Sequence, residues 1–83
     1  MSMPAFVACQ RVMAIVDCFQ PRSGSVDARN PCAIAVSFPV GGLGHPETIA
    51  DSAIRMFDDA GFCVVSNDSD DRDARFVLAD MAA

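Results

Sequence analysis

The sequence of 83 residues contains no lysine, tryptophan or tyrosine, and His45 is its only histidine. The absence of lysine excludes all lysine chemistry, including Schiff-base catalysis. Eleven acidic residues against six arginines give a formal net charge of -5 and a pI near 4.4. This balance disfavours direct binding of nucleic acid, which depends on neutralising phosphates. Because spacing places no serine or cysteine beside His45, we expect a protein that is not an enzyme and needs no cofactor.

Cysteine usage argues against a metal site and against a secreted disulfide scaffold. The four cysteines, at positions 9, 18, 32 and 63, form no closely spaced pair of the kind that zinc sites use. The acidic segment after Asn67 also fails the pattern of a calcium-binding EF-hand loop, so no metal is expected. No cationic region precedes the first apolar run, and residues 5–19 are too short and too polar to span a bilayer. We therefore expect reduced thiols, no membrane association and a cytoplasmic location.

The composition is that of one folded domain. Apolar residues make up 52% of the chain and charged residues 20%, which is the range of globular proteins. A chain this short has room for one modest core, so residues 1–83 are expected to form a single α+β domain.

Two apolar runs in the first half of the chain, residues 12–18 and 32–38, flank a loop rich in proline, glycine and serine. An antiparallel register that pairs Val12 with Phe38 and Val16 with Ile34 gathers apolar side chains on one face, which predicts a β-hairpin. Residues 5–19 also fit an N-terminal helix with an apolar stripe, and the sequence leaves this alternative open. The stripe would consist of Phe6, Cys9, Met13 and Val16.

The second half of the chain carries clearer boundaries. Pro46 suits the first position of a helix, apolar residues then recur at spacings of three and four, and Gly61 suits its end, so residues 46–60 are predicted to be helical. Residues 62–66 and 74–79 are predicted to be two strands joined by an acidic loop. The predicted order is strand, strand, helix, strand, strand, a four-stranded antiparallel sheet with one helix packed on one face. No internal repeat is visible.

The negative charge is concentrated after residue 46. Residues 47–83 hold nine acidic residues and three arginines. We expect the end of the predicted helix and the acidic loop to meet in one patch that docks on a basic surface of a partner protein. An alternative is that these residues simply keep the loops solvated. The candidate partner-binding residues are Asp58, Asp59, Asp68, Asp70, Asp71 and Asp73.

A second candidate surface is the sheet face that a single helix leaves uncovered. In the predicted hairpin this face carries Met13, Ile15 and Phe19, which are apolar. Because large apolar patches are unusual on free monomers, these residues are candidates for a homodimer interface or for binding another protein. The corresponding function is a non-catalytic subunit or an antitoxin-like module.

In its size, acidity and predicted strand-strand-helix-strand-strand order, the whole chain resembles the small anti-CRISPR proteins of phages. The resemblance implies a stoichiometric inhibitor in the cytoplasm of the host cell. It implies a partner as well, namely a bacterial RNA-guided defence complex whose basic nucleic-acid channel the inhibitor occupies, with carboxylates in place of phosphates.

Overall fold

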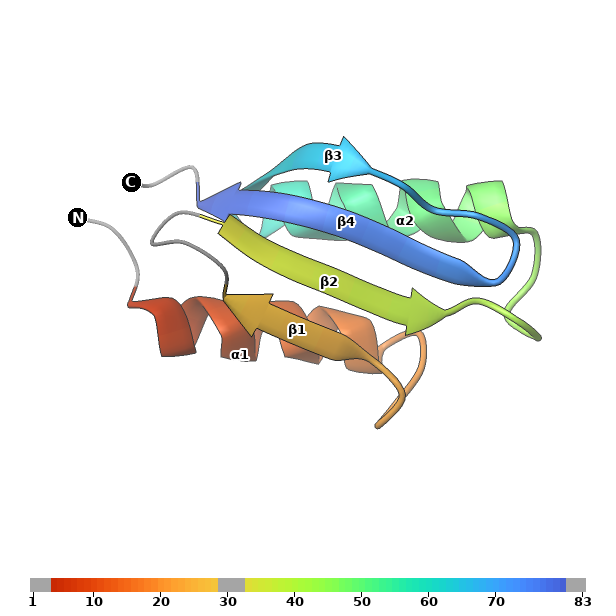
Figure 1. Cartoon of the computed structure of the whole chain (residues 1–83), viewed down its shortest axis with the longest axis horizontal. Coiled ribbons are helices and arrows are strands. Elements are labelled where there is room, and N and C mark those ends of the chain that lie inside the picture. Colours follow the sequence, from red (N-terminus) through yellow and green to blue (C-terminus); the bar gives the residue numbers. More distant parts are fainter. Residues whose placement is uncertain (1–3, 29–32, 81–83) are drawn as a thin grey trace.

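The computed structural model describes residues 4–28 and 33–80, which form two helices and four strands. The elements follow one another as α1 (Ala5–Asp17), β1 (Ser25–Ala28), β2 (Ala33–Pro39), α2 (Pro46–Asp59), β3 (Phe62–Asn67) and β4 (Asp73–Asp80). All neighbouring strands are antiparallel, in the spatial order β1-β2-β4-β3. Both helices lie on the same face of the sheet, α1 behind β1 and α2 behind β3 and β4 (Figure 1).

The core lies between this sheet face and the two helices. Alternate residues of β2 and β4 point into it, so that Val36 and Phe76 are paired neighbours on the buried face. Phe38 and Phe76 lie in an aromatic group that Phe19 and Phe57 complete, with ring centroids 5.2 to 6.4 Å apart. Apolar residues fill the core: Ala8, Val12, Val16, Ile34, Val36, Phe38, Val40, Ala50, Ala53, Phe57, Phe62, Ala74, Phe76 and Leu78.

The α+β class, the four-stranded antiparallel sheet and the elements of the second half are confirmed. Helix α2 begins with Pro46 at its first turn, where the missing amide costs no hydrogen bond. It ends before Gly61, whose positive φ of 93° suits a residue without a Cβ atom. Strands β3 and β4 then form the predicted hairpin.

The first predicted strand is wrong, because residues 5–17 form the helix that the sequence left as an alternative. Ala8, Val12 and Val16 follow one another at helical spacing, and all three are buried against the sheet. An apolar run of this length satisfies a period of two and a period of 3.6 almost equally well, so the pattern alone does not decide. The structure therefore has two helices instead of one. Cys32, at the start of the other predicted strand, lies outside the described residues.

The true partner of β2 is β1, which lies inside the segment predicted to be a loop. Val26 pairs with Val36 and is the residue of β1 that faces the helices. Gly24, just before this strand, lies so close to α1 that a Cβ atom there would collide with the side chain of Val16. The absence of a side chain at Gly24 thus lets β1 pass beside the helix.

The two halves of the chain repeat the same arrangement, helix, outer strand, inner strand. The units α1-β1-β2 and α2-β3-β4 pair through their inner strands β2 and β4, which gives the sheet an approximate two-fold axis. A bulge between Val64 and Ser66 shifts the register of β3 by one residue. With that shift, Ser25 and Asp27 of β1 correspond to Ser66 and Asp68, 41 residues further along. The structure therefore contains an internal repeat that the sequence hides.

Candidate functional site

Four of the predicted docking residues lie together at one end of the molecule. The loop between β3 and β4 lies beside the first turns of α2, because α2 leads directly into β3, which runs back alongside it. This placement gathers Asp70 and Asp71 near Glu47 and Asp51 of α2, and Asp68 and Asp73 stand at the two ends of the same loop. We call these six carboxylates, with Arg72 and Arg75, the acidic end.

Asp58 and Asp59 do not belong to this cluster. They are exposed in the last turn of α2, next to the start of β3. A helix of 14 residues is about 21 Å long at 1.5 Å per residue, so its last turn lies far from the acidic loop. The expected convergence of all six predicted carboxylates is therefore wrong, and the structure splits them between the two ends of α2.

The acidic end carries most of the protein's net charge. Its six carboxylates and two arginines leave a formal charge of -4, out of -5 for the whole chain. The rest of the chain is therefore nearly neutral. A concentrated charge of this kind produces a local field that attracts a positively charged surface, and salt screens that attraction.

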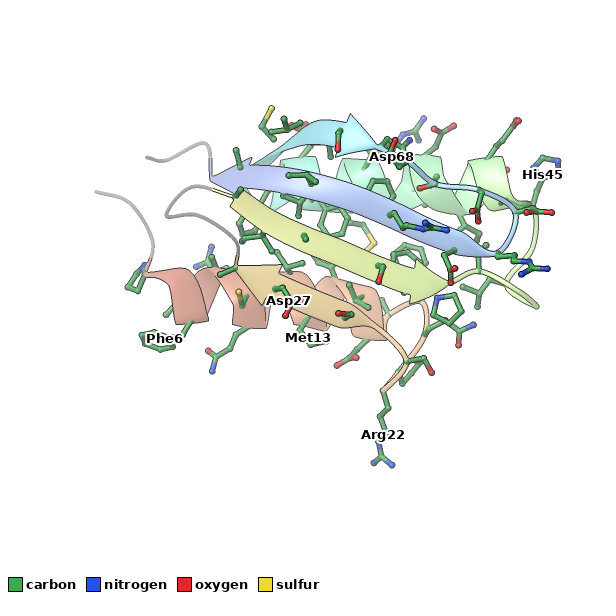
Figure 2. The ribbon with its side chains drawn as sticks, viewed as in Figure 1. Phe6, Met13, Arg22, Asp27, His45 and Asp68 are labelled. Atoms are coloured by element: carbon green, nitrogen blue, oxygen red, sulfur yellow. The ribbon has the colours of Figure 1, made fainter. Side chains whose placement is uncertain are left out.

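A hollow of about 500 Å³ lies between α2 and the loop at the acidic end. Carboxylates stand on both of its sides, Glu47 and Asp51 on the helix and Asp70 and Asp71 on the loop. The exposed side chain of His45 lies at the same end of the molecule (Figure 2). The remaining lining residues are Pro46, Ala50, Asn67 and Ser69.

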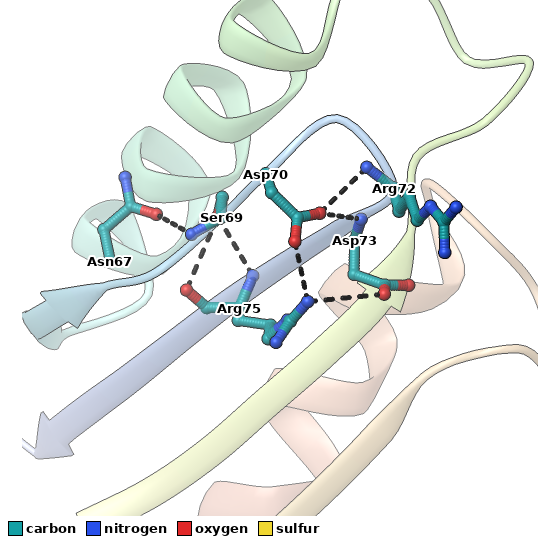
Figure 3. A network of polar contacts seen from close by, with 6 residues as sticks. All are labelled: Asn67, Ser69, Asp70, Arg72, Asp73 and Arg75. Atoms are coloured by element: carbon teal, nitrogen blue, oxygen red, sulfur yellow. Dashed lines mark hydrogen bonds and ion pairs between the residues drawn. The ribbon is translucent and has the colours of Figure 1, made fainter.

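Asp70 organises the loop. Its Oδ1 accepts hydrogen bonds from the backbone amides of Arg72 and Asp73, both 2.8 Å long, and its Oδ2 accepts one of 2.8 Å from Nη2 of Arg75 (Figure 3). The amides of Asp73 and Arg72, with a smaller contribution from the Arg75 charge, lower the pKa of the Asp70 carboxyl. Asp70 is therefore ionised at neutral pH, and its carboxylate is occupied within the protein.

Further hydrogen bonds fix both sides of the loop. Ser69 receives the amide of Arg75 on its Oγ at 3.0 Å, and its own amide donates to Oδ1 of Asn67 at 3.1 Å. The amide of Val40 donates to the carbonyl of Arg72 at 2.9 Å, which ties the loop to the end of β2. These bonds fix the backbone from which the remaining carboxylates of the loop project.

The carboxylates that remain available are those of Asp68 and Asp71. Arg75 approaches Asp70 at 2.8 Å and Asp73 at 3.7 Å, and these are the ion pairs that the described residues form. Asp68 and Asp71 are exposed, and within residues 4–28 and 33–80 their side chains make no ion pair. Both can receive a cationic group from outside.

Glu47 and Asp51 were not among the predicted docking residues, although their spacing in the sequence is a signal for them. They are four positions apart on a helix, which places both on one face. The sequence did not show that the loop between β3 and β4 lies beside that face of α2.

In the part of the chain that the structure describes, no group of three or more His, Cys, Asp or Glu side chains is arranged to hold a metal ion.

The apolar residues predicted to mediate dimerisation do not lie on a sheet face. Met13 and Ile15 belong to α1, and both are partly buried against the core. Phe19 follows the helix, and its ring stacks on that of Phe38 with centroids 5.2 Å apart. All three contribute to the packing of the domain itself, so the surface that was predicted from them is wrong in its placement.

Neither of the two described helices is long and apolar enough to cross a membrane. In comparisons of this chain with protein-family models, with curated proteins and with solved structures, nothing matches.

Proposed function

We propose that this chain is a non-catalytic inhibitor that docks through its acidic end on a basic surface of a partner protein. The observation that carries the proposal is the concentration of charge at the acidic end, whose formal charge is -4 while that of the whole chain is -5. This charge lies around a hollow bounded by an ordered loop. A loop backbone that is ordered before binding loses little conformational freedom on binding, so more of the electrostatic attraction contributes to affinity. The docking residues in this proposal are Glu47, Asp51, Asp68 and Asp71, with Asp70 and Asp73 holding the loop.

The resemblance in size and acidity to small phage anti-CRISPR proteins supplies the class of partner, although the element order that also suggested it differs from the order in the structure. A bacterial RNA-guided complex holds nucleic acid in a positively charged channel, where it recognises the phosphate backbone. A group of carboxylates on an ordered loop and helix presents the same sign of charge as that backbone. In this proposal the acidic end occupies the channel and excludes the DNA.

The test is competition between the protein and target DNA. Purified RNA-guided complexes from several bacteria are loaded with guide RNA, and their binding of labelled target DNA is measured with increasing amounts of the protein. We expect stoichiometric loss of DNA binding for at least one complex, with the affinity of the inhibitor falling as salt is raised. Failure to inhibit any complex of a broad panel contradicts the assignment to RNA-guided systems.

The position of α2 offers a matched control. Asp51→Arg with Asp71→Arg reverses two carboxylates of the acidic end, whereas Asp58→Arg with Asp59→Arg makes the same change of charge at the other end of the helix. We expect the first pair to weaken inhibition about tenfold or more and to flatten its salt dependence, and the second pair to change it little. Equal losses from both pairs would show that net charge alone drives binding.

A second candidate function is that of a subunit or antitoxin-like module that binds through an apolar face. It is favoured by the sheet face opposite the helices, which no described residue covers (Figure 1). Binding through such a face alone is nearly indifferent to salt, so the salt dependence of affinity separates the two candidates.

A further inference from the structure

The sheet face opposite the helices has a strip of small side chains along its centre. Residues that alternate with the core positions point to this face, among them Ala33 and Ala35 of β2 and Val77 and Ala79 of β4. All four are partly exposed. Neither described helix contacts this side of the sheet, so within residues 4–28 and 33–80 the strip is uncovered (Figure 1).

The face is hollowed instead of flat. A depression of about 300 Å³ crosses it from Asp27 on β1, over Ala35 and Val77, to Ser66 and Asp68 at the end of β3. Ala35, Ser37 and Val77 on the two inner strands form its floor, with Arg75 at one end, and the polar residues of the outer strands form its margins: Ser25, Asp27, Ser66 and Asp68. A depression of this shape accepts a ridge of side chains from another element.

Both margins of the depression carry an acidic residue. Asp27 of β1 pairs with Ala35 of β2. In the other repeat Asp68 holds the position that corresponds to Asp27, beside Arg75 of β4, and its amide donates to the carbonyl of Arg75 at 3.0 Å. The approximate two-fold axis thus places Asp27 and Asp68 on opposite sides of the strip (Figure 2). Arg75 is engaged by Asp70, so its charge is already balanced within the protein.

We infer that this face is a docking groove for an amphipathic helix of the basic partner, with small apolar residues facing the strip and Lys or Arg along both sides. The two inner strands lie about 5 Å apart, so one helix of about 10 Å diameter covers both, and about two helical turns cover the strip formed by Ala33, Ala35, Val77 and Ala79. Helix on sheet is also the packing that the domain uses on its other face.

Charge complementarity selects this occupant over a second copy of the chain. Two copies facing each other would bring the acidic margins of one against the acidic margins of the other, on molecules of net charge -5. A helix with basic residues on both sides instead places a positive charge near Asp27 and another near Asp68. The inference rests on the proposed function in taking the partner to be basic. The groove shares Asp68 and Arg75 with the acidic end, but it lies on the opposite face of the sheet from α2 and does not include the hollow lined by Glu47, Asp51, Asp70 and Asp71.

The experiment uses the full chain labelled with ¹⁵N and a designed peptide of 16 residues. The peptide has alanine and leucine on one helical face and lysine along both sides of it. In an NMR titration we expect saturable shifts of the amides of residues 33–37 and 75–79. Ala35→Glu should weaken binding about tenfold or more although it adds negative charge, because the longer side chain fills the groove.

Two further variants keep the test decisive. Ala14→Glu makes the same substitution at an exposed position of α1, on the other side of the molecule, and should bind the peptide as the unmodified protein does. Ala79→Glu blocks the strip at a second position, between Ala33 and Cys63, should Ala35→Glu not fold.

Two results would overturn the inference. Shifts confined to residues 46–51 and 67–73, with undiminished binding by both blocking variants, would place the peptide at the acidic end alone. A dimer in light scattering that Ala35→Glu dissociates would assign the groove to a second copy. The inhibition assay with the Asp51 and Asp71 reversals reports separately on the proposed function, so either idea can fail while the other stands.

Discussion

Substituting Gly24 by alanine should destabilise the protein, although Gly24 is in a connecting segment. A Cβ atom at this position would overlap Cγ1 of Val16, which is completely buried in α1, and would lie 3.5 Å from the carbonyl oxygen of Ser37. The helix and the strand are both fixed by the core, so neither can move away freely. Overpacking of this kind costs about 1–3 kcal/mol, which corresponds to a fall in Tm of roughly 4–20 °C for a domain of this size.

Gly41 provides the matched control. It lies in the loop after β2, and a Cβ atom there would meet no other atom within 4 Å. Gly41→Ala should therefore leave stability unchanged or raise it by up to about 1 kcal/mol, because alanine restricts the unfolded chain. The two variants make the same chemical change, but only Gly24→Ala should lower Tm.

A double-mutant cycle identifies the colliding group. Val16→Ala removes the methyl groups that a Cβ atom at position 24 would strike, so Gly24→Ala should cost little in that background. Stability is measured by urea unfolding of all four proteins, and a coupling of about 1 kcal/mol or more is expected. If Gly24→Ala behaves like Gly41→Ala, or if the two substitutions at positions 16 and 24 are additive, the packing of α1 against the start of β1 is not as described here.

Three other substitutions follow from the structure. Asp70→Asn should lower stability at pH 7, and the difference from the unmodified protein should shrink as the pH falls from 3.8, the ordinary pKa, through the lowered pKa of Asp70 in the folded protein, because protonation then removes the stabilisation. Urea unfolding at pH 7 and at a pH well below 3.8 checks this, and an effect independent of pH contradicts it. Phe57→Ala should cost about 3–5 kcal/mol in the same assay, whereas Phe6→Ala, at a side chain 68% exposed, should change stability by less than about 0.5 kcal/mol. Gly61→Ala should lower the unfolding midpoint by an amount equivalent to about 1 kcal/mol, because alanine disfavours a φ of 93°; an unchanged midpoint would contradict the assigned end of α2.

The second half of the chain was predictable because its boundaries are marked by residues with strong local preferences. Pro46 and Gly61 set the limits of α2, and the polar stretch after Asn67 separates two apolar runs that can only be short strands. In the first half, the run that became α1 contains no such residue in its interior, and its apolar content fits two periods. Strand β1 was hidden because, of its four residues, Val26 alone packs against the core.

The candidate site was predictable in composition but not in shape. The sequence identifies the acidic loop, yet it does not say which end of α2 that loop approaches. That depends on β3 running back along the helix, which brings Glu47 and Asp51 to the loop and leaves Asp58 and Asp59 at the far end. The role of Asp70 in ordering the loop also depends on three-dimensional contacts, because both of its backbone donors and Arg75 must converge on one carboxylate.

The most direct test of the account is hydrogen–deuterium exchange of the protein bound to an RNA-guided complex that it inhibits. The acidic end predicts slower exchange on binding for the amides of residues 46–51 and 67–73, and unchanged exchange for residues 56–60. Protection of residues 56–60 without protection of the loop would contradict docking through the acidic end.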